Sequence, residues 1–172
     1  MRPVKESGKT FKQNAIKKAV LPSRQADALV IGEDSGLVVA ALKGAPGIRS
    51  ARYSGAQNQM GRDPANNLKL LRALERVPPS RRKAMFVCTA AIAYRGKLLG
   101  TVRGVVHGSI ALKAHGHRGF GYDPLFIPKG YQSTFGELGA AVKDRLSHRA
   151  QALRRAKPLI VKALKSAKSG RI

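Results

Sequence analysis

The sequence predicts one domain of the α/β class, and three observations support this. The chain has 172 residues, which is enough to bury a hydrophobic core without disulfides or a structural metal. Helical patterns with cap residues alternate along it with shorter apolar, β-rich runs. Turns rich in Gly and Pro separate these segments. We therefore expect residues 1–172 to form a single globular domain that ends in a frayed basic tail at about residues 165–172.

A helix is expected near the N-terminus, over residues 11–21. Thr10 and Gln13 match the capping box, in which a Thr caps the helix and a Gln three residues later reaches back. Pro22 disfavours a helical residue before it and is expected to end the helix there. The side chains expected to face the core are Phe11, Ala15, Ile16 and Val20.

The next segment is expected to form a strand, an acidic turn and a second strand. Residues 28–32 and 37–42 are the two strands, and Glu33-Asp34-Ser35-Gly36 is the turn between them. Only nine residues of the chain are acidic, and two of these nine stand side by side where the first strand is expected to stop. Because strand ends often expose metal ligands and general bases, Glu33 and Asp34 are candidates for such a role. An ordinary acidic turn is the alternative.

The middle of the chain predicts a helix followed by a hairpin. Asp63-Pro64 supplies an N-cap and a proline at the first helical position, which predicts a helix over residues 64–75. Two apolar, β-rich runs at residues 84–94 and 97–112 flank Arg95-Gly96 and predict antiparallel strands. The helix is expected to bury Leu68, Leu71 and Leu74.

The C-terminal part is expected to hold a short strand at residues 125–127 and a long helix. Ser147 is the expected N-cap of that helix, which continues to about residue 165 and is bent or interrupted at Pro158. His148 and Arg149 lie in its first turn, where cations are unfavourable for the helix dipole. Free backbone N–H groups and these side chains together suit a phosphate, although simple basic decoration is the alternative.

The segment over residues 115–124 is expected to be a binding loop. It is rich in glycine, with interleaved aromatic, basic and acidic side chains, and it is too polar for a core. His115 and His117 lie two residues apart in it, but no third ligand is near in sequence. We interpret them as solvated loop histidines rather than zinc ligands.

The formal net charge of +24 favours binding to polyanions: nucleic acid, an anionic membrane surface or phosphorylated small molecules. The basic residues are spread over the whole chain and aromatic residues are few, which argues against a stacking platform for single strands. No DNA- or RNA-binding motif is visible. Contact with nucleic acid is therefore expected only through non-specific charge.

Cysteine content and hydropathy indicate the compartment. The single cysteine, Cys88, lies in an apolar run and is expected to pack as a small hydrophobe. No leader segment and no membrane-spanning stretch is visible. We expect a protein of the reducing cytoplasm that does not bind membranes.

Adjacent carboxylates and dispersed cations suit one chemistry together, the hydrolysis of nucleotides. Mg²⁺ often binds through one or two carboxylates plus substrate phosphates, so Glu33 and Asp34 are a sufficient pair. The attacking water needs a base, and the phosphoryl group needs cations around it.

Several separated motifs, in the same order over nearly the whole chain, resemble the inosine triphosphate pyrophosphatase family. They are Glu6-Ser7-Gly8-Lys9-Thr10-Phe11, Asn14 to Ala19, Glu33-Asp34-Ser35-Gly36-Leu37, Gly44-Ala45-Pro46-Gly47, Ser50-Ala51-Arg52-Tyr53, Asn67 with Leu70-Leu71, Gly119 to Pro124, and Lys143 with Ser147-His148-Arg149.

The resemblance implies Mg²⁺-dependent hydrolysis of nonstandard purine nucleoside triphosphates (ITP, dITP and XTP) to the monophosphate and pyrophosphate. It implies an elongated mixed β-sheet flanked by helices, with two lobes, a central nucleotide cleft and a homodimer. The strand and the Thr/Ser-Gly-Asn-x-x-Lys loop with which family members begin are missing before Glu6, so the fold is expected to be N-terminally truncated. A catalytically impaired remnant that binds polyanions or nucleic acid is the alternative.

The resemblance also implies roles for individual residues. Asp34 is the general base or a metal-bound carboxylate, and Glu6 and Glu33 help to hold the magnesium. Phe120 stacks on the purine, and His148 with Arg149 contacts the 6-oxo edge or a neighbouring phosphate. The residues expected to address the phosphates or the base are Lys18, Ser35 and Lys143, and those expected to shape the base pocket are Gly121, Tyr122 and Asp123.

Overall fold

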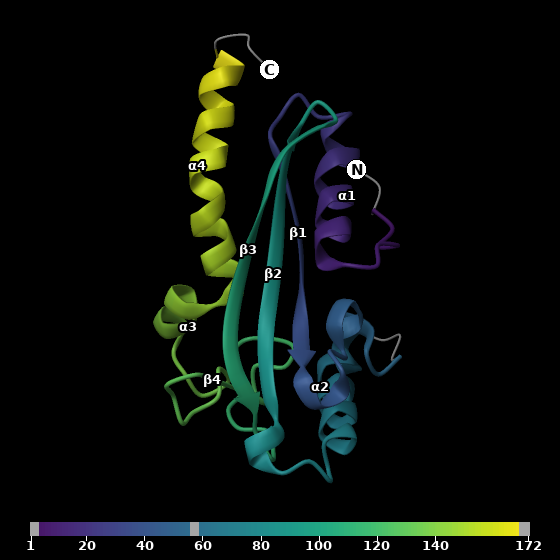
Figure 1. The fold of residues 1–172 in the computed structure, drawn as a ribbon, viewed down its shortest axis with the longest axis vertical. Coiled ribbons are helices and arrows are strands. Elements are labelled where there is room, and N and C mark those ends of the chain that lie inside the picture. Colours follow the sequence, from purple (N-terminus) through teal and green to yellow (C-terminus); the bar gives the residue numbers. More distant parts are fainter. Residues whose placement is uncertain (1–3, 56–58, 169–172) are drawn as a thin grey trace. The chain divides into compact units, whose positions relative to one another are not determined.

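The computed structural model describes residues 4–55 and 59–168, and it confirms the predicted α/β class (Figure 1). The described residues form, in chain order, α1 (Phe11–Ser23), β1 (Val30–Val39), two 3-10 helices (Ala40–Leu42 and Gly47–Arg52), α2 (Gln59–Ala73), a third 3-10 helix (Pro79–Arg81), β2 (Lys83–Tyr94), β3 (Lys97–Ile110), β4 (Phe126–Pro128), α3 (Ala140–Leu146) and α4 (His148–Lys168). None of the described helices is both long and apolar enough to cross a membrane.

The chain divides into two compact units. Unit 1 consists of Met1–Ser35, Cys88–Gly104 and His148–Ile172, and unit 2 consists of Gly36–Val87 and Val105–Ser147. Each unit has its own packed residues and its own cluster of predicted site residues, so each is described separately below.

The described strands form a four-stranded sheet in the order β1-β2-β3-β4. The predicted hairpin is confirmed: β2 and β3 are joined by Arg95 and Gly96, which both have positive φ (45° and 80°), as a tight hairpin turn requires. β3 pairs with β4 in antiparallel fashion, with Ser109 opposite Ile127. The short strand predicted at residues 125–127 is thus confirmed, shifted by one residue.

The acidic segment is not a turn. β1 runs without interruption from Val30 to Val39, and buried and less buried residues alternate through Gly32, Glu33 and Asp34. Turn-type residues remain extended here because both carboxylates find cationic partners on the faces of the strand, as described below. The second strand expected at residues 37–42 is accordingly shorter, and Ala40–Leu42 forms a 3-10 helix.

Two helices differ from the prediction in their limits, and their expected core faces are confirmed in part. α1 continues through Pro22 to Ser23, whose hydroxyl donates to the Val20 carbonyl and so satisfies one acceptor of the last turn. Its buried residues are Asn14, Ala15, Ala19 and Ser23. Of the side chains expected to face the core, Ala15 is buried, Ile16 and Val20 pack partly buried against the same alanine cluster, and Phe11 is only partly buried. α2 begins at Gln59, before the expected Asp63 cap, and ends at Ala73. Of the three leucines expected to be buried, Leu74 is fully buried just beyond the helix and Leu71 packs partly buried against the core, whereas Leu68 is half exposed. Leu70 is the additional fully buried leucine.

The C-terminal helices differ from the prediction in two respects. A short helix, α3, precedes Ser147 and was not expected. α4 begins at His148, as expected, but it contains Pro158 and extends to Lys168, three residues beyond the predicted end. The remainder of the expected tail, residues 169–172, lies outside the described residues.

In unit 1, small residues allow α1 and α4 to pack closely against opposite faces of the strands. Ala15 and Ala19 of α1 pack on Ala91 and Ala93 of β2, whereas Ala152 of α4 packs on Cys88 and Ala90. β1 has a glycine where α1 crosses it: a Cβ on Gly32 would lie 2.4 Å from the Ala19 backbone nitrogen. The backbone of α1 therefore rests directly on β1.

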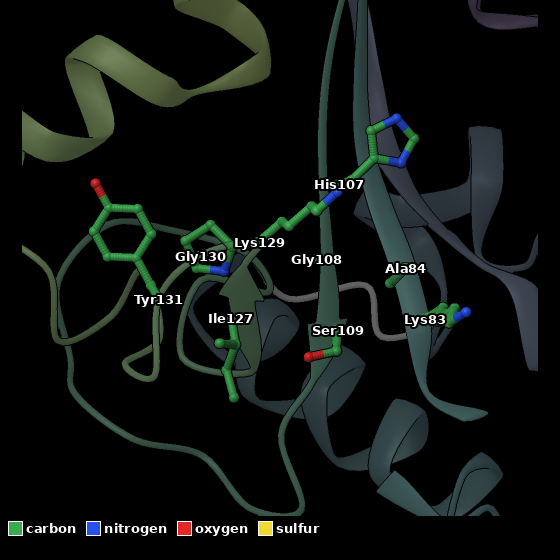
Figure 2. A pocket seen from close by; sticks show the side chains of 10 residues that line it. Lys83, Ala84, His107, Gly108, Ser109, Ile127, Lys129, Gly130 and Tyr131 are labelled. Carbon is green, nitrogen blue, oxygen red and sulfur yellow. The ribbon is translucent and has the colours of Figure 1, made fainter. Parts of the chain in front are cut away.

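In unit 2, the two faces of the sheet have different environments. One face carries a core that includes Phe86, Phe126 and Phe135, with ring centroids of neighbouring pairs 4.5 and 5.5 Å apart. The guanidinium of Arg82 is buried beside this core and donates to three backbone carbonyls, those of Leu74, Val77 and Ala111. The other face carries a hollow of about 680 Å³ near β4 (Figure 2).

Candidate active site

The first cluster of predicted site residues lies in unit 1, around Asp34. The Asp34 carboxylate is buried and accepts two hydrogen bonds from α1, from Asn14 Nδ2 at 3.0 Å and from Lys18 Nζ at 3.1 Å. Asn14 and Lys18 are four residues apart, so both point to the same side of the helix. Since α1 lies directly on β1 at Gly32, their donors reach the next inward-facing residue of the strand, which is Asp34.

The segment before α1 brings a second carboxylate to the same place. The Gly8 backbone N–H donates to Asn14 Oδ1 at 2.7 Å, which fixes the segment that carries Glu6. Glu6 Oε1 then lies 2.5 Å from Lys18 Nζ. Glu6, Asn14, Lys18 and Asp34 are called the Asp34 cluster below.

Lys18 is the cation shared by the two carboxylates of the Asp34 cluster. Burial lowers the pKa of Lys18, but the hydrogen bond to Glu6 and the charge of Asp34 together outweigh burial, and the net pKa is raised. Its ammonium also donates to the Glu33 carbonyl at 3.1 Å. Lys18 is therefore a fixed positive charge at neutral pH.

Glu33 lies apart from this cluster, with other partners. Its carboxylate forms a two-point ion pair with Arg149 of α4, with Nη2–Oε1 at 2.6 Å and Nε–Oε2 at 3.0 Å. The Cys88 thiol is 3.9 Å from Glu33 Oε2. Burial, followed by the negative charge of Glu33, raises the pKa of Cys88 to about 12. Cys88 is buried as expected, but it also contacts a carboxylate, which the sequence interpretation did not include.

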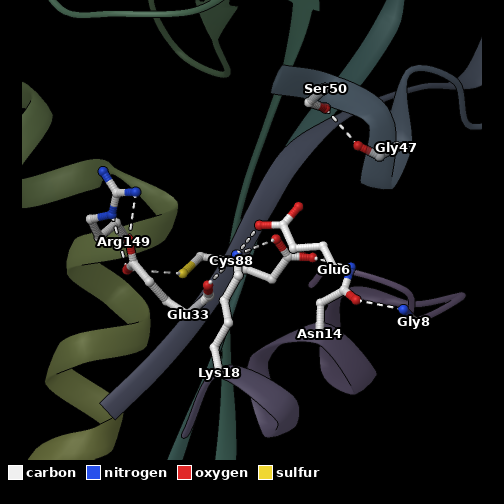
Figure 3. A network of polar contacts seen from close by, with 10 residues as sticks. Glu6, Gly8, Asn14, Lys18, Glu33, Gly47, Ser50, Cys88 and Arg149 are labelled. Carbon is white, nitrogen blue, oxygen red and sulfur yellow. Dashed lines mark hydrogen bonds and ion pairs between the residues drawn. The ribbon is translucent and has the colours of Figure 1, made fainter. Parts of the chain in front are cut away.

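The structure therefore does not bring Glu33 and Asp34 together as a carboxylate pair. Successive side chains of a strand point to opposite faces, and β1 is extended through both residues. Figure 3 shows Glu33 directed to Arg149 of α4, whereas Glu6, Asn14 and Lys18 lie at α1. The pair of carboxylates that does converge is Glu6 with Asp34, 28 residues apart in sequence.

The second cluster lies in unit 2 and is centred on Asp123. The Asp123 carboxylate is buried, forms a short ion pair with Lys143 of α3, and accepts a hydrogen bond from the Phe120 backbone N–H at 2.7 Å. Burial raises the pKa of Asp123, and the hydrogen bond from Lys143 opposes this only in part. Lys143 Nζ also lies 4.2 Å from the centroid of the Phe120 ring, which is 55% exposed. Phe120, Asp123 and Lys143 are called the Asp123 cluster below.

The loop that carries the Asp123 cluster is tied down at Gly121 and Tyr122. The Gly121 N–H donates to Asp63 Oδ2 at 2.6 Å, and its carbonyl accepts from Asn67 Nδ2 at 3.0 Å. The Tyr122 hydroxyl donates to the Ser50 carbonyl at 2.9 Å, and burial raises the pKa of Tyr122. Hydrogen bonds of Gly121, Tyr122 and Asp123 thus hold this loop and leave the Phe120 ring as the exposed group.

The remaining predicted residues lie outside the two clusters, Ser35 and His148 in unit 1 and His115 and His117 in unit 2. His148 is buried at the first position of α4, where Gly104 of β3 allows a close approach: a Cβ there would lie 2.0 Å from the His148 carbonyl. Ser35 is half-buried, next to Asp34 in β1. His115 and His117 are exposed, as expected for solvated loop histidines.

Asn14 and Asp63 contact the candidate site residues, but sequence reasoning assigned no role to either. Asn14 was quoted only as part of a motif, although a buried polar residue four positions before Lys18 indicates a shared target. Asp63 was interpreted as a helix cap; it lies inside α2 and accepts from the loop that carries Phe120. Its partner lies 58 residues away in sequence, so no local pattern could have identified it.

Comparison with known proteins identifies the family. The sequence profile of the Ham1 family matches residues 1–159. The chain belongs to this family.

Solved structures and curated relatives agree with this assignment. The Staphylococcus aureus Ham1 protein matches with a TM-score of 0.85 and 36% identity, over 94% of this chain and 82% of that one. A HAM1 protein from Coxiella burnetii matches with the same TM-score and identity, over 94% and 81%. A relative from Rhodopirellula baltica that is named dITP/XTP pyrophosphatase is 47% identical over 95% of this chain and 77% of its own length. A Bacillus subtilis protein of the same name is 41% identical over 91% and 78%.

Proposed function

We propose that this member of the Ham1 family hydrolyses ITP, dITP and XTP between the α and β phosphates to give the monophosphate and pyrophosphate. The observation that carries the proposal is the Asp34 cluster, in which Glu6 and Asp34, distant in sequence, converge on the Lys18 ammonium. Hydrolysis of a nucleotide needs a base for water and a cation for the phosphates, and this cluster contains both. Relatives named dITP/XTP pyrophosphatase support the purine type of the substrate.

The donor set of the Asp34 cluster fits magnesium. Glu6 and Asp34 supply hard carboxylate oxygens that face one point, and their negative charges are compensated there by a single ammonium group. No group of three or more described His, Cys, Asp or Glu side chains could hold a metal by itself. Mg²⁺ often takes only one or two carboxylates and completes its shell with water and substrate phosphates, so Glu6 and Asp34 would be a sufficient protein ligand pair. When bound, Mg²⁺ neutralises phosphate charge and positions the phosphoryl group.

The residues of the cluster have distinct tasks under this proposal. Asp34 is the general base or a metal-bound carboxylate, and Asn14 and Lys18 hold its two oxygens in place. Lys18 supplies a positive charge for the phosphates, because its raised pKa keeps it protonated. Glu6 joins Asp34 as a magnesium ligand. Glu33 is not part of this set, because its carboxylate is directed to Arg149.

The Asp123 cluster suits recognition of a purine base. The exposed Phe120 ring offers a face for stacking, and its backbone is fixed by Asp123. Lys143 and Asp123 place a donor and an acceptor beside that ring. From the resemblance, His148 and Arg149 contact the 6-oxo edge of the base or a neighbouring phosphate, and Ser35 addresses the phosphates. A homodimer and a cytoplasmic location remain expectations of the resemblance.

Product analysis tests the proposal. The protein is incubated with dITP and Mg²⁺, and pyrophosphate and orthophosphate are measured separately, with dATP and dGTP as comparison substrates. We expect pyrophosphate and dIMP from dITP, with much slower turnover of the comparison substrates. Release of orthophosphate would indicate another class of hydrolase. Absence of turnover, together with salt-sensitive binding to nucleic acid, would favour the impaired remnant.

A further inference from the structure

The hollow on the outer face of the sheet in unit 2 is built from side chains of three strands and one loop. Its lining residues are Lys83 and Ala84 of β2, His107, Gly108 and Ser109 of β3, Ile127 and Pro128 of β4, and Lys129, Gly130 and Tyr131 of the loop that follows. Ser109 is paired with Ile127, and the Lys129 N–H donates to the His107 carbonyl at 2.9 Å. These four side chains therefore stand next to one another on the face opposite the aromatic core.

The hollow has apolar lining residues beside its polar ones. Ile127 is one of them and is partly buried. The chain turns after β4, with the Tyr131 N–H donating to the Pro128 carbonyl at 3.0 Å, and so brings Tyr131 to the rim. The Tyr131 hydroxyl is contacted by Arg145 Nη2 at 3.4 Å. The volume of about 680 Å³ lies in the range of small-molecule sites.

The charge of the hollow is positive and is not compensated by the protein. Lys83 and Lys129 are exposed at its rim, and in Figure 2 the Lys129 side chain extends in the direction of His107. None of the described lining residues is acidic, and neither lysine forms an ion pair with any residue in the described part of the chain. The described ion pairs of Glu6, Asp27, Glu33, Asp34 and Asp123 are made with other cations, those of Lys18, Arg95, Lys143 and Arg149.

We propose that this hollow is a second ligand site, separate from the two clusters described above, and that it binds a phosphorylated small molecule of nucleotide size. Lys83 and Lys129 contact the phosphate as charged donors. Ile127 and the Tyr131 ring contact the apolar or aromatic part of the same molecule. An inorganic anion would use only the cationic rim, so a nucleoside monophosphate should bind more tightly than phosphate alone.

Amide chemical-shift mapping with AMP as the probe tests this site directly. We expect AMP to shift the amides of Ser109, Lys129, Gly130 and Tyr131 at millimolar concentration, inorganic phosphate to do so more weakly, and added NaCl to weaken both. The double variant Lys83→Gln/Lys129→Gln should weaken AMP binding at these amides by about 10- to 100-fold. The matched control, Lys12→Gln/Lys97→Gln, removes the same charge at exposed positions of unit 1 and should leave the affinity unchanged.

Several results would overturn the proposal. If AMP leaves these amides unshifted, or if the control variant weakens binding as much as the double variant, the hollow is not a site and only net charge acts. If a single-stranded oligonucleotide shifts the same amides at far lower concentration than AMP, the face binds a nucleic-acid backbone instead. If the double variant changes the sedimentation of the protein but AMP causes no shifts, the face is a contact between protein copies.

Discussion

Glu33 and Asp34 are neighbours in β1, but replacing each by its amide should affect the hydrolysis of dITP very differently. Asp34→Asn and Glu33→Gln remove one negative charge each at neighbouring positions and almost preserve side-chain shape. Only Asp34 lies in the cluster proposed to bind magnesium and activate water, whereas Glu33 pairs with Arg149. We therefore expect Asp34→Asn to abolish hydrolysis of dITP and Glu33→Gln to leave most of it.

The magnitudes follow from the contacts of each residue. Both Asp34 oxygens accept from donors, so an amide at this position must place its own NH₂ group against Asn14 or Lys18. That conflict should lower the free energy of unfolding by about 1–3 kcal/mol, which leaves a domain with a typical stability of about 5–15 kcal/mol folded. Loss of a positioned base should slow turnover by about 10²- to 10⁴-fold. The side chains of Glu33 and Arg149 are both over one-third exposed, so loss of their ion pair should lower the free energy of unfolding by only about 0.2–1 kcal/mol.

The assay is pyrophosphate release from dITP over a range of Mg²⁺ concentrations, with urea unfolding measured on the same samples. The Mg²⁺ concentration that gives half of the maximal rate should be the same for Glu33→Gln as for the parent protein. The reasoning is refuted if Asp34→Asn turns over at a rate close to the parent. It is equally refuted if Glu33→Gln loses as much activity as Asp34→Asn and needs more Mg²⁺, because Glu33 would then be a metal ligand.

Three further predictions concern buried positions. Gly32→Ala should lower the free energy of unfolding by about 1–3 kcal/mol and reduce dITP turnover, because its Cβ would displace α1, whereas Gly61→Ala, with open space around it, should do neither. Arg82→Lys should lower the free energy of unfolding, measured with urea, by about 1–3 kcal/mol for each buried carbonyl left without a donor. Arg81→Lys, at an exposed position, should leave the free energy of unfolding unchanged. The Cys88 thiol should resist alkylation at pH 8 in the folded protein but react once the protein is unfolded in urea. The folded pKa of Cys88 is about 12 against 9.0 for a free thiol, so the contribution of the thiol to stability is complete below pH 9.0 and is lost as the pH rises toward 12. In that window the urea midpoint of the parent should fall relative to the midpoint of Cys88→Ala, which has no thiol to titrate.

Features set by neighbouring residues could be predicted from the sequence. The Thr10 cap is present, since the Gln13 N–H donates to Thr10 Oγ1 at 3.1 Å. The Gln13 side chain reaches back as expected, but it accepts from the Lys9 N–H, at 2.7 Å. The turn at Arg95-Gly96 also formed where predicted, because a two-residue hairpin turn needs positive φ values and glycine adopts these readily. Apart from Asn14, the residues of the Asp34 and Asp123 clusters were named in advance through the family resemblance, which rests on the order of the motifs and not on contacts between them.

Features set by distant contacts could not be predicted. Glu33-Asp34-Ser35-Gly36 has the composition of a turn, and only the partners supplied by α1 and α4 keep it extended. The same contacts decide which carboxylates meet, so the pairing of Glu6 with Asp34 was not predictable from their spacing. Arg82 is another example, because an arginine next to Arg81 gives no sign in the sequence that its guanidinium is buried.

The extended course of β1 also determines which changes in length this segment can accept. A deletion of one residue within β1, before Glu33, would turn every following side chain to the other face. Asp34 would then take the place of Glu33 and face Arg149, and Ser35 would take the place of Asp34 beside Lys18. Glu33 would take the place of Gly32, where the backbone of α1 leaves no room for a Cβ. Homologous sequences should therefore differ in length at the Lys43–Gly44 turn after the strand, where both residues have positive φ, and not within β1 itself.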